Sequence, residues 1–157
     1  MKLSLFFIGK TSFEYIDKGI AEYEKRIKRY INFEIKIIKD IKTGKNMPPK
    51  IIKQKEGEQL FKQVNDNDIL ILADEKGKEY TSREFAKFID NKIVTGAKHV
   101  IFVIGGAYGF SEEVYKRANG KVSLSKMTFS HQPIRVLFAE QLYRAFTIIK
   151  GEPYHND

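Results

Sequence analysis

The chain has 157 residues, a formal net charge of +8 and no cysteine. That length favours a single domain, residues 1–157, whose core is large enough to fold without metals or disulfides. The lack of cysteine excludes a disulfide scaffold and thiolate metal ligands, and it fits a reducing cytoplasm. No apolar run reaches membrane-spanning length and the opening run is too short for a signal peptide, so we expect a cytoplasmic protein with no membrane partner.

The positive charge is concentrated in the first part of the chain. Up to Val64 there are fifteen Lys and Arg against eight Asp and Glu, whereas the remainder has thirteen against twelve. We therefore distinguish a basic half, residues 1–66, from a second half, residues 67–157. A basic face attracts a polyanion such as RNA by releasing counterions, without selecting a sequence. A lysine-rich solvated surface explains the composition equally well.

Strand-like and helical patterns alternate along the chain. Apolar residues at every third or fourth position predict helices, and continuous or alternating apolar runs predict strands. The predicted strands are residues 2–8, 33–38, 68–73 and 100–104; the predicted helices are residues 12–31, 51–64, 82–94, one from about 111, and one from Pro133. Ser82 is expected to cap its helix, residues 74–78 to form a turn, and residues 42–50 a polar loop suited to RNA contact. The alternation predicts an α/β fold with a mainly parallel sheet.

Two groups of residues in these elements leave their role open. In the first predicted helix, Lys25, Arg26, Lys28 and Arg29 lie mainly off the apolar stripe, and they suit either phosphate contacts or a solvated face. The helix from Pro133 is apolar nearly all round, so we expect it to be buried in the core or against a second subunit.

The loops after two predicted strands and after the short apolar segment that ends at Leu124 are the expected ligand site. Open α/β sheets bind ligands beyond the carboxyl ends of their strands, here after Ala73, after Ile104 and after Leu124. The second of these loops reads GGAYG from Gly105, which suits either a tight strand-to-helix turn or close approach of a ligand to the backbone. It does not have the GxGxxG spacing, and no acidic residue follows at the distance that a ribose contact requires, so an NAD site is excluded. No GxxxxGK[ST] motif is present, which excludes a P-loop NTPase.

Few side chains suit catalysis, and none suits a metal. The three histidines are too scattered for a metal-ligand pattern. His131 and Arg135 are four residues apart at a helix start, where His131 is either a polar residue near the cap or a direct participant. Arg135 and Arg144 lie on opposite sides of the helix and cannot serve one pocket within one subunit. Glu140 and Arg144 have the spacing of a structural ion pair.

Four sequence blocks in order carry a resemblance to a known family. They are LADEKGKEYTSREFA from Leu72, FVIGGAYGF from Phe102, SLSKMTFSHQPIRVLFAEQLYRAF from Ser123 and the ending GEPYHND. Together they resemble the ribosomal RNA large subunit methyltransferase H family of the SPOUT superfamily, over essentially the whole chain. The resemblance implies methylation of N3 of a pseudouridine in 23S rRNA, with the large subunit or the assembled ribosome as partner. A non-catalytic RNA- or ribosome-binding module is the alternative.

The resemblance also implies a fold, a cofactor and its contacts. Members of this family have an α/β fold with a deep C-terminal trefoil knot, bind S-adenosylmethionine in the knot loops and act as homodimers. Carried over to this chain, the cofactor contacts are Leu72, Gly105, Leu124, Ser125, Lys126, Met127, Thr128 and Phe129. These residues belong to the three loops that the strand pattern had already indicated.

Methylation of N3 requires the loss of a weakly acidic proton, which a base or a positive charge assists. The candidates are His131, Arg135, Tyr143, Arg144, Tyr154 and His155. We expect the C-terminal tail to fold over the bound cofactor, across a dimer interface, which would also bring Arg144 of one subunit toward the site of the other. This family commonly has a basic residue after PYH, whereas this chain has Asn156 and Asp157, so a phosphate contact at that place is in doubt.

Overall fold

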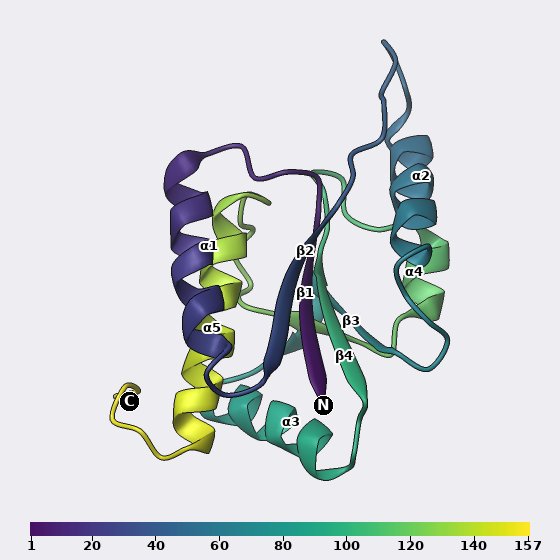
Figure 1. Ribbon diagram of the computed structural model, residues 1–157. Helices are drawn as coiled ribbons and strands as arrows, with labels where there is room; N and C mark the ends of the chain where they lie inside the picture. Colours follow the sequence, from purple (N-terminus) through teal and green to yellow (C-terminus); the bar gives the residue numbers. More distant parts are fainter.

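The computed structural model describes all 157 residues as one parallel sheet flanked by helices (Figure 1). The five strands lie in the order β2-β1-β4-β3-β5, and every neighbouring pair is parallel. The elements are β1 (Lys2–Ile8), α1 (Glu14–Ile27), β2 (Asn32–Ile38), α2 (Pro49–Phe61), β3 (Ile69–Glu79), α3 (Ser82–Val94), β4 (His99–Ile104), α4 (Glu112–Arg117), β5 (Gly120–Ser123) and α5 (Pro133–Ile149). Because β1 pairs with β4, strands of the basic half and of the second half belong to the same sheet.

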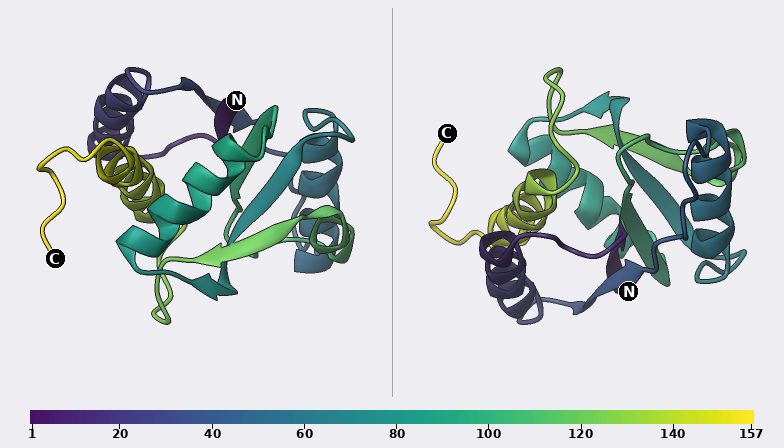
Figure 2. Two further views of the ribbon diagram at one scale, coloured as in Figure 1. Left: turned by 90° about the horizontal axis from the view of Figure 1, so that it is seen from below. Right: turned by 90° about the horizontal axis from the view of Figure 1, so that it is seen from above.

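The sheet is covered on both faces, as the continuous apolar strands predict. Alternate residues of β1 point to opposite faces: Leu3, Leu5 and Phe7 pack in a core with α1, α3 and α5. Phe6 and Ile8 pack in a second core with α2 and α4. Figure 2 shows the two helical layers on either side of the sheet. The long helix α5 is buried within its own chain against α1 and α3, although Leu137 stays 43% exposed.

The predicted fold class is confirmed, and most element bounds agree with prediction. Two local predictions are wrong. Residues 74–78 do not form a separate turn, because β3 continues to Glu79 and pairs with β5 on both sides of an irregularity. Gly77 permits this pairing, since a Cβ there would lie 2.6 Å from the Val122 nitrogen. Ser82 is not the cap of α3; Thr81 is, in a capping box with Glu84.

The first helix is shorter than predicted at both ends. It begins at Glu14 because the Ser12 amide is held outside it, donating to Oε1 of Gln132. It ends at Ile27, after which the Tyr30 amide turns back to the Ile27 carbonyl and the chain enters β2. No helix of the structure is long and apolar enough to cross a membrane. The trefoil knot that the resemblance implies stays a prediction.

Candidate functional site

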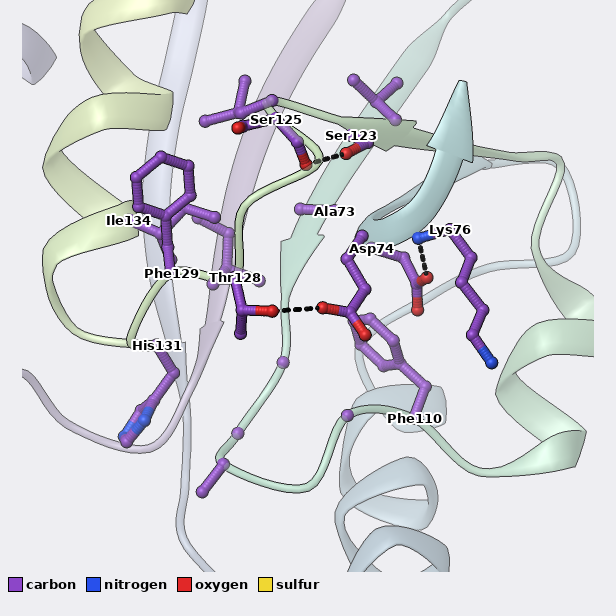
Figure 3. Close-up of a pocket in the computed structure, with 18 of the residues that line it drawn as sticks. Ala73, Asp74, Lys76, Phe110, Ser123, Ser125, Thr128, Phe129, His131 and Ile134 are labelled. Atoms are coloured by element: carbon purple, nitrogen blue, oxygen red, sulfur yellow. Dashed lines mark hydrogen bonds between the residues drawn. The ribbon is translucent and has the colours of Figure 1, made fainter. Parts of the chain in front are cut away.

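A pocket of about 350 Å³ lies at the carboxyl ends of β3, β4 and β5 (Figure 3). Its wall comes from the three loops that the sequence indicated, so a pocket lies where the ligand site was predicted, and the binding of a ligand there stays a prediction. The residues that line it and were predicted to contact a cofactor are Gly105, Leu124, Ser125, Met127, Thr128 and Phe129. A volume of this size suits a ligand of nucleoside dimensions.

Two predicted contacts lie outside the lining. The Leu72 side chain is fully buried in the core between the sheet and α2, so only its backbone is near the loops. Lys126 is exposed in the loop after β5 and does not line the pocket. That loop projects from the body of the protein (Figure 2), and two bonds shape it: Ser123 Oγ donates to the Ser125 carbonyl at 2.8 Å, and the Met127 amide donates to Ser125 Oγ at 3.0 Å.

Several lining residues were missed by sequence reasoning. Asp74 and Glu75 follow the apolar part of β3 and place two carboxylates at the pocket. Thr128 Oγ1 donates to Glu75 Oε2 at 2.8 Å, which joins the loop after β5 to β3 (Figure 3). The Tyr115 hydroxyl donates to Asp74 Oδ2, and burial together with this carboxylate raises the pKa of Tyr115. The position of the acidic pair directly after an apolar strand was a usable signal, but nothing in the sequence indicated Tyr115.

The glycine loop forms another wall of the pocket. Phe110 closes against Gly105, and a Cβ on Gly105 would lie 3.1 Å from Phe110 Cζ. On the other side of the loop, a Cβ on Gly106 would lie 2.6 Å from Glu56 Oε2 of α2. Gly109 has φ +81°, a conformation that side chains disfavour, and its amide donates to the Gly106 carbonyl. The loop is thus a tight turn whose residues also line the pocket.

His131 is the one predicted catalytic residue at the pocket. It precedes α5 and lies at the edge of the pocket, with its ring directed away from Thr128 (Figure 3). Burial, and secondarily the nearby Arg135 cation, lowers the pKa of His131 below its ordinary value of 6.5. Its imidazole is therefore mainly neutral at pH 7 and has a nitrogen free to accept a proton.

Arg135 is fully buried and does not line the pocket. Its Nη2 donates to the Ile8 carbonyl at 2.8 Å and its Nη1 to Thr11 Oγ1 at 3.2 Å, while the guanidinium lies 4.8 Å from the centre of the Phe7 ring. Burial lowers the pKa of Arg135 to about 10, so it remains a cation at neutral pH. These contacts tie α5 to the end of β1.

The other predicted catalytic residues gather at the opposite end of α5. Arg144 pairs with Glu140 at 2.6 Å, as its spacing predicted, and Tyr154 donates to the same carboxylate at 3.0 Å. Arg144 also contacts His155 Nδ1 at 3.0 Å; because a guanidinium only donates, Nδ1 accepts and the imidazole proton lies on Nε2, facing Asp157. Tyr143 packs edge-on against Tyr154.

This second group is remote from the pocket of its own chain. The C-terminal tail leaves the far end of α5 (Figure 1). Arg144 is eleven positions beyond Pro133, or about 16 Å along the helix axis. As predicted, Arg135 and Arg144 do not serve one pocket within one chain.

Apolar walls, a glycine turn and paired carboxylates at the carboxyl edge of a parallel sheet make this pocket the candidate ligand site of an α/β protein. Residues 1–155 match the family described as "Predicted SPOUT methyltransferase", and the chain belongs to this family of methyltransferases.

Among its relatives, proteins named "Ribosomal RNA large subunit methyltransferase H" are similar over nearly their whole length. The one from Parabacteroides distasonis is 52% identical over 157 residues, covering 100% of both chains. Those from Christiangramia forsetii and Cytophaga hutchinsonii are each 52% identical over 156 residues, covering 99% of this chain and 99% and 100% of theirs.

Proposed function

We propose that this chain transfers a methyl group from S-adenosylmethionine to N3 of a pseudouridine in the 23S rRNA of the large ribosomal subunit. Membership of a methyltransferase family and the names of the full-length relatives support this. The observation that carries it is the pocket itself, where apolar, acidic and backbone groups meet beside a neutral histidine. Such a substrate implies that the protein works in the cytoplasm, where ribosomes are found.

The residues of the pocket fit S-adenosylmethionine. Ile104, Phe129 and Ile134 offer apolar surface for an adenine ring, and Gly105 adds no side chain to this wall of the pocket. Asp74 and Glu75 bring two carboxylates to the ligand, which suits the positive charges of a sulfonium and an ammonium group. Bound there, the molecule supplies an electrophilic methyl group.

The protein's own task is to position the nucleobase and to remove its N3 proton. A displacement at carbon requires the attacking nitrogen in line with the leaving group, so orientation supplies much of the acceleration. His131 lies at the pocket rim in its neutral form and is our candidate for the base that accepts the N3 proton. Arg135 is held in the core by Ile8 and Thr11, so we assign it the role of fixing the start of α5, on which His131 depends.

The remaining candidates require a second copy of the chain. Arg144, Tyr154 and His155 lie together at the far end of α5, and in a twofold dimer that end can approach the pocket of the partner. The cation would favour the N3 anion, and Tyr154, whose pKa is raised to about 12 by burial and by Glu140, would donate rather than accept. A stable monomer with full activity would contradict this arrangement.

Removal of residues 153–157 tests the tail. The truncated protein is expected to keep S-adenosylmethionine affinity and to lose methylation rate, because Tyr154 and His155 are gone while the pocket is intact. The matched control is Asp157→Asn, which removes the charge that Asp157 presents to Arg83 and to His155 but keeps the side chains of Tyr154 and His155. Unchanged methylation rate and RNA affinity after truncation would rule out a role for the tail.

Mass spectrometry of large-subunit rRNA from cells with and without the protein tests the whole proposal. A mass increase of one methyl group on a pseudouridine, present only with the protein, is the expected result. Calorimetry with S-adenosylmethionine separates this function from a non-catalytic RNA-binding module, which would bind RNA without binding the methyl donor. An unmodified pseudouridine in both samples would refute the proposed reaction.

A further inference from the structure

Lysine side chains are unevenly paired along the basic half of the chain. On α1 and at its C-cap, Lys18, Arg26 and Lys28 each form an ion pair with the glutamate four residues earlier, at 2.8 to 3.0 Å, while Lys25 forms none. Between residues 39 and 55 the sequence has six lysines and a single carboxylate, Asp40. None of these six lysines forms an ion pair in the structure, whose salt bridges all lie elsewhere.

We call residues 39–55 the basic arm; its lysines are Lys39, Lys42, Lys45, Lys50, Lys53 and Lys55. All are exposed except Lys53, which is half-buried. The arm also holds little apolar surface, since Ile51 is its only large apolar side chain that is markedly exposed, at 37%. A surface that offers charge without an apolar centre suits a polyanion better than a folded protein partner.

The basic arm leaves the same edge of the sheet that bears the pocket. It begins where β2 ends at Ile38, projects beyond the body of the protein and returns through Pro48 and Pro49 into α2 (Figure 1). The helix it enters then packs on the glycine loop, where Glu56 approaches Gly106. A ligand that lies along the arm therefore runs toward the wall of the pocket.

The carboxylates near the basic arm do little to neutralise it. Asp40 is exposed but lies beside Gly9: a Cβ on Gly9 would lie 2.4 Å from its Oδ1, and its charge acts on the buried Arg135 and on His131. Glu56 faces Gly106, and burial, followed by repulsion from Asp40, raises the pKa of Glu56 to about 7. At neutral pH the arm thus keeps most of its positive charge.

We propose that the basic arm, residues 39–55, binds the phosphate backbone of the RNA substrate and guides the target nucleoside to the pocket. This inference rests on the proposed function for the identity of the RNA. We do not assign phosphate binding to the ion-paired cations Lys18, Arg26 and Lys28, because a neighbouring glutamate already neutralises each of them.

The test compares two variants that lose the same charge. The arm variant carries Lys39→Gln, Lys42→Gln, Lys45→Gln and Lys50→Gln, all at exposed positions. The control carries Lys62→Gln, Lys87→Gln, Lys98→Gln and Lys116→Gln, which are likewise exposed and without ion pairs. Each variant is taken as correctly folded if its circular dichroism spectrum and its affinity for S-adenosylmethionine match those of the wild type.

The readout is the salt dependence of binding to a 23S rRNA transcript. Each lost phosphate contact makes the slope of log K against log salt less steep by about 0.7 to 0.9. Relative to the wild type, the slope should therefore be less steep by about 3 for the arm variant and by less than about 1 for the control. With large ribosomal subunits as substrate, the arm variant should raise KM and leave kcat at saturation unchanged.

Equal slopes for the two variants would overturn the role of the arm, even if the wild type methylates rRNA normally. If the arm variant alone loses RNA affinity but the wild type transfers no methyl group, the arm is upheld and the proposed reaction fails. The two ideas therefore fail separately.

Discussion

The two arginines of α5 share a helix and a charge but belong to different environments. Arg135, at the start, is fully buried and bonds to the end of β1. Arg144, near the end, has 23% of its side chain exposed and joins Glu140, His155 and Tyr154. A buried cation with fixed partners holds a fold together, whereas a partly exposed one can rearrange around a ligand. The same residue type therefore serves stability at one end and, we propose, chemistry at the other.

The largest expected effect is on stability at the buried end. Arg135→Ala removes charge-assisted bonds to Ile8 and the contact with Phe7, so the free energy of unfolding should fall by about 3 kcal/mol in urea denaturation. Arg135→Met, which keeps the apolar bulk, should lose less. If the Arg135→Ala protein were fully stable but inactive, the structural role assigned to Arg135 would be wrong, and its guanidinium would take part in the reaction.

Next in size is the loss of the base. His131→Gln should lower the methylation rate about 100-fold while the affinity for S-adenosylmethionine is kept. Since burial lowers the pKa of His131, the wild-type rate should rise with pH as the imidazole loses its proton, with its half-maximal value below pH 6.5. A variant that keeps the same pH profile as the wild type would show that another group accepts the proton.

A smaller kinetic effect is expected at the exposed end of α5. Arg144→Ala should slow methylation about tenfold, and should lower the free energy of unfolding by only about 1 kcal/mol. Arg26→Ala is the matched control, because Arg26 pairs with Glu22 at the same spacing and lies over the Tyr143 ring, as Arg144 lies over the Tyr154 ring that packs against it. Equal loss of rate in both variants would mean that packing on this pair of tyrosines, rather than the charge of Arg144, matters.

The smallest effect concerns Glu56 behind the glycine loop. Its pKa is raised to about 7 in the folded protein, from an ordinary 4.5, so the folded state binds a proton that the unfolded state releases between those values. Stability therefore falls as pH rises from 4.5 to 7. Glu56→Gln removes this loss of stability. The midpoint temperature of unfolding of the variant should therefore exceed that of the wild type by more at pH 8 than at pH 4.5.

The gain from Glu56→Gln should stay below about 1 kcal/mol, because solvent screens a half-exposed carboxyl. The exposed Glu58→Gln serves as the control and should show no such pH dependence. A difference that is the same at both pH values would indicate that the pKa of Glu56 is not raised by folding.

The sequence alone predicted the alternation of strands and helices and the edge of the sheet where the pocket lies. Continuous apolar runs such as that of β4 are covered on both faces in any α/β sheet, and loops after parallel strands meet at one edge. The ion pair of Glu140 with Arg144 was equally predictable, because helical spacing fixes it locally. The continuation of β3 through Gly77 was not, since it depends on pairing with β5.

What the sequence determined is therefore local: periodicity, capping and spacing within one element. Only the tertiary structure decided that Arg135 is buried beneath the end of β1, that Tyr115 reaches Asp74, and that the lysines of the basic arm are unpaired while Lys18 of α1 is paired. Each of these depends on which side chains from distant segments come within bonding distance. Such contacts follow from the packing of the whole chain, because burial and partners set the charge and role of a group, and its residue type alone does not.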